Sequence, residues 1–270
     1  MKRAHHMRGE EGFSLIEMMI AAVIFILLCS AAFALLSLAQ QRYQTESQVL
    51  NSFQEARFGL DEIVRDVNGS GYPPQNSFSF SSTPPPANLY ASTPIAWDPN
   101  YVSNSPCLIG TAGGGTCTTP GDWDVIIERD VDPWRHDGVE WTRYQLQGNV
   151  LLRSQTFKVV SAEPDPTTSP SFVPYVQNVM NNASPAQITQ FRAAYPNMFP
   201  GGNPVPVFSY TCYTPYGPQL CVSAGSFNSP VNVTDVEITL IVMAPTQDAQ
   251  TGLPRLIELH GRGHSLNPIQ

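Results

Sequence analysis

An apolar run from Met18 to Leu38 constrains this chain more than any other feature. Residues 13–38 form a stretch of 26 residues. As a helix with a rise of ~1.5 Å per residue, that stretch is long enough to cross a ~30 Å hydrocarbon core. Its single charge is Glu17, and an ionised carboxylate at the centre of a membrane helix costs ~2.5–3.5 kcal/mol on insertion scales. A plain anchor has no use for that charge, so we expect Glu17 to have a specific partner.

A short basic leader precedes the apolar run and ends at Gly12. In an ordinary secretory signal, the cleavage site follows the apolar core. Here the candidate site, between Gly12 and Phe13, comes before it, so residues 13–38 are expected to remain in the mature chain. The basic residues of the leader keep the N-terminus cytoplasmic and predict that the C-terminal part lies outside.

The motif Gly12-Phe13-Ser-Leu-Ile-Glu17 after a basic leader resembles the class III signal of type IV prepilins. This resemblance implies that a prepilin peptidase cuts between Gly12 and Phe13 and methylates the new amine of Phe13. It also implies an assembly role for Glu17, whose carboxylate would neutralise the Phe13 amine of a neighbouring subunit. The alternative is that Glu17 lies at the headgroup level of an ordinary, uncleaved anchor.

After Leu38 the sequence turns polar but keeps a helical pattern. Residues 40–68 contain no proline and one glycine, Gly59. Their apolar residues recur at spacings of three and four, which predicts one buried face of a helix ending near Asn68. These residues are Val49, Phe53, Ala56, Leu60, Ile63, Val64 and Val67. Charged residues lie mostly off this face, and Asp61 and Arg65 are spaced for an i,i+4 ion pair.

The helix segment 53–67 and the Gly71-Tyr72 pair after it resemble the PilW family of minor pilins. Minor pseudopilins of type II secretion, of the GspJ type, carry a related signature. The resemblance covers residues 12–72, with weaker likeness at 139–153 and 233–262. It implies an α+β fold of the type IV pilin kind, in which a long N-terminal helix packs on an antiparallel sheet.

The C-terminal part reads as β-rich with long loops. A hairpin is predicted from Val139 to Arg153, with its turn at Gly148-Asn149. The further predicted strands are 123–128, 207–212, 233–243 and 253–260, the last two forming a pair, and together they suggest one meandering sheet. Residues 73–121 are interpreted as loops. Residues 161–204 are interpreted as a polar insertion, with a short helix at 185–195.

The five cysteines indicate an oxidising compartment. Cys29 lies in the apolar run and is interpreted as a small packing residue. Cys107 and Cys117 are close in sequence, as are Cys212 and Cys221, which favours two local disulfides among three possible connectivities. Free thiols and a four-thiolate zinc site are the alternatives, although neither pair has the CxxC spacing of zinc sites.

Charge and motifs exclude several functions. The formal net charge is −8, and loss of residues 1–12, with three basic and two acidic residues, would make it −9. This argues against nucleic-acid binding through a basic surface. Two segments are weak candidates for metal sites. The loop with Asp130, Asp132 and Asp137 is more simply interpreted as a solvated turn, and His260-Gly-Arg-Gly-His264 as a frayed tail. We expect no catalytic site, metal or cofactor.

These observations predict residues 1–12 as a leader, 13–38 as a membrane and filament-core helix, 39–70 as an amphipathic helix, and 71–270 as a β-rich outer domain. The function that they favour is a minor pilin of a type IV pilus or related filament. Its partners would be the prepilin peptidase, other pilins and an inner-membrane assembly platform, with a surface filament as its final location. The alternatives are a type II secretion pseudopilin, or an uncleaved membrane-anchored binding protein or enzyme.

Overall fold

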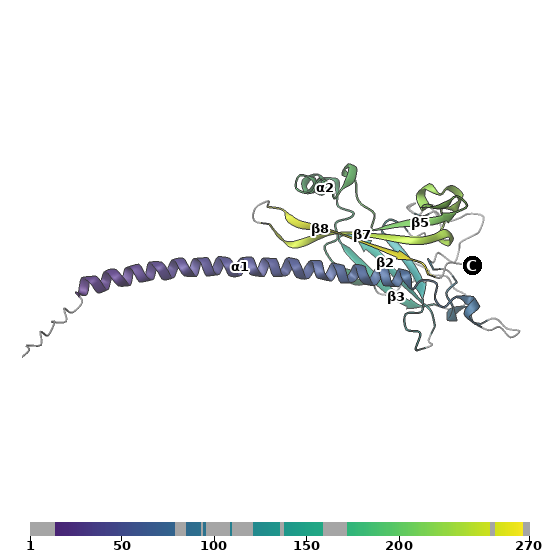
Figure 1. The fold of residues 1–270 in the computed structure, drawn as a ribbon, viewed down its shortest axis with the longest axis horizontal. Coiled ribbons are helices and arrows are strands. Elements are labelled where there is room, and N and C mark those ends of the chain that lie inside the picture. Colours follow the sequence, from purple (N-terminus) through teal and green to yellow (C-terminus); the bar gives the residue numbers. More distant parts are fainter. Residues whose placement is uncertain are drawn as a thin grey trace, which may run out of the picture. The chain divides into compact units, whose positions relative to one another are not determined.

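The computed structural model describes residues 14–78, 85–92, 94–95, 109, 121–135, 138–158, 172–248 and 252–266. The chain forms two compact units, residues 1–48 and 49–270, each of which is considered by itself. One helix, α1 (Leu15–Asn68), contributes to both units. Figure 1 shows α1 and the strands of the second unit, which together make an α+β fold of the pilin-like kind.

Within residues 49–270, α1 buries one face, as predicted. Its buried residues are Val49, Ala56, Gly59, Leu60, Ile63, Asp66 and Val67, while Phe53 and Val64 pack against the same core. The predicted Asp61–Arg65 ion pair is wrong, because Arg65 Nη2 instead lies 3.7 Å from Glu62 Oε1. After Asn68 the chain turns at Gly71, whose φ of 77° favours glycine. The Gly71 N–H then donates to the Glu128 carbonyl at 2.8 Å, which ties the end of the helix to a strand.

The described strands form two four-stranded antiparallel sheets, so the expectation of one sheet is wrong. The first sheet has the order β1 (Asp124–Arg129), β2 (Glu140–Gln147), β3 (Val150–Phe157) and β4 (Val173–Val176). The second has the order β6 (Gly217–Leu220), β5 (Phe208–Thr214), β7 (Val233–Gln247) and β8 (Pro254–His264). The N–H groups of Val207 and Phe208 both donate to the Asp122 carbonyl, at 2.9 and 3.1 Å, so the two sheets meet through loop contacts rather than a shared ladder.

Two predicted hairpins are confirmed. Strands β2 and β3 pair from Glu140↔Phe157 to Gln147↔Val150 around the Gly148-Asn149 turn, where Gly148 has a φ of 58°. Strands β7 and β8 pair from Asp235↔His264 onward. The long β7 is buried on both faces at Leu240, Ile241 and Val242, because one face lies on the main core and α2 covers the other.

The predicted insertion at 161–204 contains regular structure. Residues Val173–Val176 form β4 beside β3, and Pro185–Arg192 form α2, where a short helix was predicted. Ser184 begins α2 with a capping box in which Gln187 completes the reciprocal bond. Short 3-10 helices occur at Gln75–Ser77, Ala87–Leu89, Pro200–Gly202, Cys221–Ser223, Gly225–Phe227 and Pro230–Asn232.

Two large apolar clusters among the described residues hold the second unit together, and a small third one joins Ile126 to Trp141. The larger joins the buried face of α1 to inward residues of both sheets, among them Tyr144, Phe208 and Leu240. The smaller places α2 over the other face of β7 and β8, where Phe191 and Phe199 meet Ile241 and Leu256. The helix and the two sheets are therefore joined by one continuous core, which fixes the end of α1.

Candidate processing, anchoring and junction sites

Glu17 folds back over the first turn of α1. The N–H of Ser14 donates to Glu17 Oε2 at 2.9 Å, and the N–H of Ile16 donates to Ser14 Oγ at 3.2 Å. These bonds satisfy N–H groups that the start of a helix leaves without partners, and a carboxylate there is favoured by the helix dipole. The Glu17 carboxylate is thus directed toward the N-terminal end of the helix. Gly12 and Phe13 lie outside the described residues.

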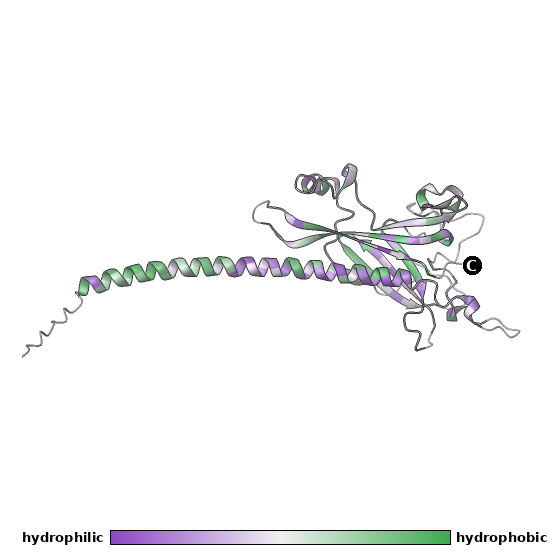
Figure 2. Cartoon of the chain, in the orientation of Figure 1, coloured by the Kyte–Doolittle hydropathy of each residue, from purple (hydrophilic) through white to green (hydrophobic). Residues whose placement is uncertain are grey.

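The first part of α1 exposes almost all of its apolar side chains. An 18-residue window of this helix has a mean hydropathy of 2.8, with no part of it buried. Figure 2 shows the ribbon of this part of the helix coloured mostly as hydrophobic. By length and composition it is the one helix among the described residues that could cross a membrane. Glu17 is the only charged residue between Ser14 and Gln41.

At the other end of α1, Asp66 is a fully buried carboxylate with two close partners. Arg129 Nη2 of β1 lies 2.5 Å from its Oδ1, and the Tyr144 hydroxyl of β2 donates to its Oδ2 at 2.6 Å. Arg153 Nη2 of β3 approaches the same oxygen at 3.8 Å. Three strands of the first sheet therefore converge on one helical residue. The sequence reasoning missed this role by placing Asp66 off the buried face.

Burial shifts the pKa values of the titratable groups where α1 meets the first sheet. Burial raises the pKa of Asp66, although the charge of Arg129 and the hydrogen bond from Tyr144 act in the lowering direction. Burial and the nearby Asp66 raise the pKa of the Tyr144 hydroxyl well above its ordinary value. Tyr144 therefore stays protonated and remains a donor to Asp66. Burial and a hydrogen bond to Glu62 likewise raise the pKa of Tyr175, whose hydroxyl donates to Glu62 at 2.8 Å.

Glycines allow β8 to lie directly against α1. A Cβ at Gly261 would lie 2.7 Å from Val64 Cγ2, and one at Gly263 would lie 2.5 Å from Val67 Cβ. Both distances are too short for a side chain, so the His260-Gly-Arg-Gly-His264 segment serves helix packing. The expected frayed tail is wrong, since β8 extends to His264, where the ring Nδ1 lies 3.1 Å from Asp235 Oδ1.

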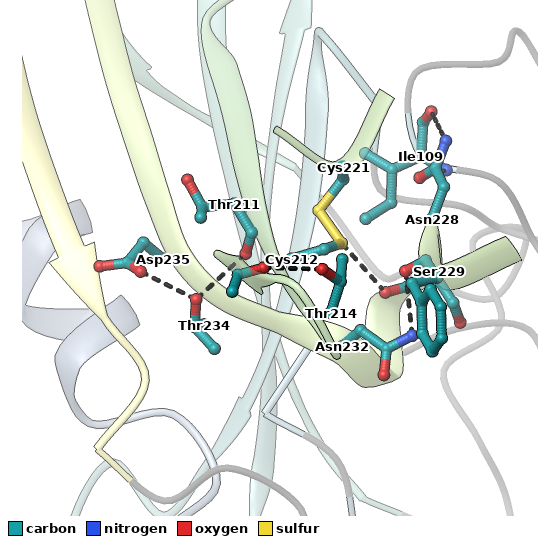
Figure 3. The surroundings of a disulfide bond; sticks show 12 residues. Ile109, Thr211, Cys212, Thr214, Cys221, Asn228, Ser229, Asn232, Thr234 and Asp235 are labelled. Atoms are coloured by element: carbon teal, nitrogen blue, oxygen red, sulfur yellow. Dashed lines mark hydrogen bonds between the residues drawn. A yellow bond between two sulfur atoms is a disulfide. The ribbon is translucent and has the colours of Figure 1, made fainter. Parts of the chain in front are cut away.

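Cys212 and Cys221 form a disulfide at the end of the second sheet (Figure 3). It joins β5 to the 3-10 turn after β6, and the sulfur of Cys212 also faces the Ser229 carbonyl at 3.7 Å. Close by, Asn228 makes two bonds with the backbone of Ile109, at 3.1 and 3.4 Å. Cys107 and Cys117 lie outside the described residues, and Cys29 is a free cysteine in α1.

The Asp-rich loop forms a local turn. The N–H of Asp132 donates to Asp130 Oδ1 at 3.0 Å, and Arg135 pairs with Asp132 at 3.0 Å. Asp137 lies outside the described residues. Within the part of the chain that the structure describes, there is no group of three or more His, Cys, Asp or Glu residues placed to hold a metal ion.

The sequence match to known proteins lies at the start of the chain. The family model described as the prokaryotic N-terminal methylation motif matches residues 7–33. A search of curated proteins gives no match to this chain. The matched segment includes the basic leader end, the Gly12-Phe13 bond and Glu17. It supports a type IV pilin-like or pseudopilin protein that is anchored through its apolar N-terminal helix.

Proposed function

We propose that this chain is a minor pilin, a structural and non-enzymatic subunit of a type IV pilus or a related filament. The observation that carries the proposal is the methylation motif at residues 7–33, followed by the exposed apolar part of α1, where Glu17 is the only charge before Gln41. Prepilin peptidase would cut between Gly12 and Phe13 and methylate the Phe13 amine. The apolar helix would hold the chain in the inner membrane until it joins the surface filament.

The position of Glu17 supports a role in assembly. Its carboxylate lies at the start of the helix, directed toward the N-terminal side. A charge in an apolar environment is stabilised by an opposite charge. The amine of Phe13 on a neighbouring subunit would supply that charge, so the correct axial position in a helical stack would be the one that pairs them.

The second unit supports a minor position in the filament. Residues 49–270 carry two sheets and α2 beside the buried face of α1. A bulk subunit repeats many times along a filament, so a large domain with long loops is better suited to an initiating or capping position. Other pilins and the inner-membrane assembly platform are the partners of this proposal.

The first experiment determines the N-terminus by intact-protein mass spectrometry after co-expression with an active prepilin peptidase. We expect a chain that begins at Phe13 and carries one methyl group. A catalytically inactive peptidase is the first control, and Gly12→Val, which alters only the residue before the cut, is the second. A chain that still begins at Met1, with a control substrate fully processed, would refute the proposal and favour an uncleaved anchor.

The second experiment separates processing from assembly. Glu17→Gln keeps the size of the side chain but removes its charge, and Gln41→Glu adds a charge elsewhere on the helix as a control. We expect Glu17→Gln to be cleaved normally yet lost from sheared filaments. Unchanged incorporation of Glu17→Gln would contradict the assembly role. Co-purification of the wild-type chain with secretion pseudopilins alone, rather than with pilins, would instead favour the type II secretion alternative.

A further inference from the structure

The hairpin of β5 and β6 carries two tyrosine rings that face solvent. Tyr213 is 63% exposed and Tyr216 is 89% exposed. Tyr213 lies on β5 opposite Pro218 of β6, and Tyr216 lies in the turn between the two strands. Neither tyrosine belongs to the apolar clusters of the second unit. Two large rings are therefore displayed within four positions of the chain without contributing to the core.

The backbone beneath these rings is held firmly. Strands β5 and β6 pair along the whole length of β6, and the Cys212–Cys221 disulfide ties the base of the hairpin (Figure 3). At the turn, the buried Thr214 hydroxyl donates to the Gly217 carbonyl at 2.8 Å and accepts from the Tyr216 N–H at 3.2 Å. The rings are thus carried on a backbone that is ordered before any ligand arrives, which lowers the entropic cost of binding.

The hairpin and its neighbours along the chain carry no charge. The sequence contains no Asp, Glu, Lys, Arg or His from residue 193 to residue 234, a segment that includes β5, β6 and the 3-10 turns after them. The first charged residue of the adjacent strand β7 is Asp235, which lies opposite Thr211 and is already bonded to Arg262 and His264. A charged ligand would find no opposite charge in this segment to offset its loss of water. The surface therefore favours a neutral ligand.

Polar groups without charge accompany the rings. Gln219 is exposed on β6, and Ser223 and Ser226 are exposed on the 3-10 turns. Tyrosine combined with serine, glycine and amide side chains is the composition of antibody binding loops, where rigid rings supply contact area and small polar groups supply adaptable hydrogen bonds. The negative face of an aromatic ring attracts groups with partial positive charge, such as the C–H groups on one face of a pyranose ring. Sugar hydroxyls both donate and accept hydrogen bonds, as amides and serine hydroxyls require.

We propose that the β5–β6 hairpin binds a neutral saccharide, with pyranose faces stacked on the rings of Tyr213 and Tyr216. A stable protein interface uses ~20–30 residues on each side, far more than this hairpin displays, whereas a trisaccharide contacts only a few side chains. Addition of a polypeptide strand to β6 is disfavoured, because this edge strand has four residues and includes Pro218. The proposal goes beyond a filament role and does not depend on it, since binding needs neither cleavage nor assembly.

Saturation-transfer difference NMR on the full chain in phospholipid nanodiscs tests the proposal, with empty nanodiscs as the blank. The neutral probes are cellotriose, mannotriose and chitotriose, and the charged probe is trigalacturonate. We expect at least one neutral trisaccharide to bind with a dissociation constant on the order of 1 mM, because few side chains contact it. Trigalacturonate should bind at least about tenfold more weakly, since its carboxylates find no partner in the uncharged segment.

Four variants locate the binding. Tyr213→Ala and Tyr216→Ala each remove a ring and should weaken binding at least about fivefold, whereas Tyr216→Phe keeps the ring and should retain most of the affinity. Trp134→Ala is the matched control, because Trp134 is 91% exposed but lies in the turn after β1, outside the hairpin. Its affinity should stay at the wild-type value. Non-reducing peptide mapping of each variant shows whether the Cys212–Cys221 bond, and with it the hairpin, is intact.

Binding of a neutral trisaccharide that is weakened in both alanine variants but kept in Trp134→Ala supports the proposal. If Tyr213→Ala loses the disulfide, Tyr216→Ala decides by itself, because Tyr216 lies outside both strands. No transfer to any neutral trisaccharide, equal affinity for trigalacturonate, or unchanged binding in Tyr216→Ala would overturn the proposal. Self-association in sedimentation velocity that Tyr216→Ala abolishes, without a saccharide signal, would overturn it as well and assign the hairpin to a second copy of the chain.

Discussion

At the residue scale, Asp66 makes the most consequential contact between α1 and the first sheet. A buried carboxylate is stable only when paired and hydrogen-bonded, and here Arg129 and Tyr144 supply those partners. Its neighbour Arg65 is exposed and forms only a distant pair with Glu62. Two adjacent charged residues thus have opposite roles, one internal and one on the surface.

Asp66→Ala is therefore expected to lower the free energy of unfolding by about 3–5 kcal/mol, because it leaves the Arg129 guanidinium buried without its counter-charge. Arg65→Ala, one residue earlier on the same turn, should cost at most about 1 kcal/mol, as for an exposed ion pair. Chemical denaturation of the full chain in detergent micelles measures both. Equal losses in the two variants would contradict the assigned role of Asp66.

Asp235, which pairs with His264 in the β7–β8 ladder, makes the stability of the fold depend on pH. Burial alone would raise its pKa, but hydrogen bonds from Thr234, Arg262 and His264 outweigh this and lower the pKa below 3.8. A lowered folded-state pKa means that Asp235 stabilises the fold above pH 3.8 and loses that contribution as the pH falls through the folded value. The pKa values of Asp66 and Asp124 are raised in the folded state, so these two groups change the stability with pH in the opposite direction.

The difference between wild type and Asp235→Asn isolates this contribution. Between about pH 5 and pH 2, the wild type should lose part of its advantage over the variant, and the two melting temperatures should converge. Thermal melts of the full chain across that range provide the measurement, with Asp132→Asn as an exposed-turn control. A constant difference at every pH would show that Asp235 contributes no proton-linked stability.

At the scale of elements, close packing of α1 against strands of both sheets depends on glycine. Gly59 lets the helix approach β4, where a Cβ would lie 2.6 Å from Val176 Cγ2, and Gly261 and Gly263 let β8 approach the helix. The sequence showed a single glycine in the predicted helix and two in the His260-Gly-Arg-Gly-His264 segment, which was expected to be a frayed tail. Their common cause became visible only once the three segments were placed together.

Gly263→Ala should destabilise the second unit by about 1–3 kcal/mol, because its methyl group would overlap Val67 in a packed interface. Gly121→Ala is the matched control, since no atom lies within 4 Å of a Cβ there. Its effect should remain within about 0.5 kcal/mol. Urea denaturation of both variants compares them directly, and a neutral Gly263→Ala would refute the close contact with α1.

The disulfide stabilises a second element pair. Cys212 and Cys221 are separated by nine positions and close the β5–β6 hairpin. In the chain-entropy account, a loop of this length contributes about 2–3 kcal/mol. The Cys212→Ser/Cys221→Ser variant should lose about that much, and non-reducing peptide mapping of the wild type should recover the linked pair. Recovery of either cysteine linked to Cys107 or Cys117 would contradict the pairing.

Across the whole molecule, the sequence predicts periodic elements better than their assembly. The buried face of α1, the β2–β3 hairpin and the β7–β8 pair follow from local spacing and turn residues, and the structure confirms them. The division into two sheets was missed because strand order depends on contacts between distant segments. Strand β4 was missed because it has four residues, one of them Pro174. Asp66 was missed because a charged residue is expected on the exposed side of an amphipathic helix, and its buried partners on the first sheet are distant in sequence.

The two compact units also predict how the full chain and its C-terminal part partition between a detergent phase and an aqueous phase. The apolar side chains of residues 15–38 are exposed, whereas residues 49–270 form an apolar core of their own. Transfer of that apolar surface into lipid is favoured by the hydrophobic effect, so the full chain should enter the detergent phase in a Triton X-114 partition. A chain that begins at Val49 should stay in the aqueous phase and keep its Cys212–Cys221 bond. Recovery of the full chain from the aqueous phase would contradict anchoring through α1, because no other described helix is long and apolar enough to hold it there.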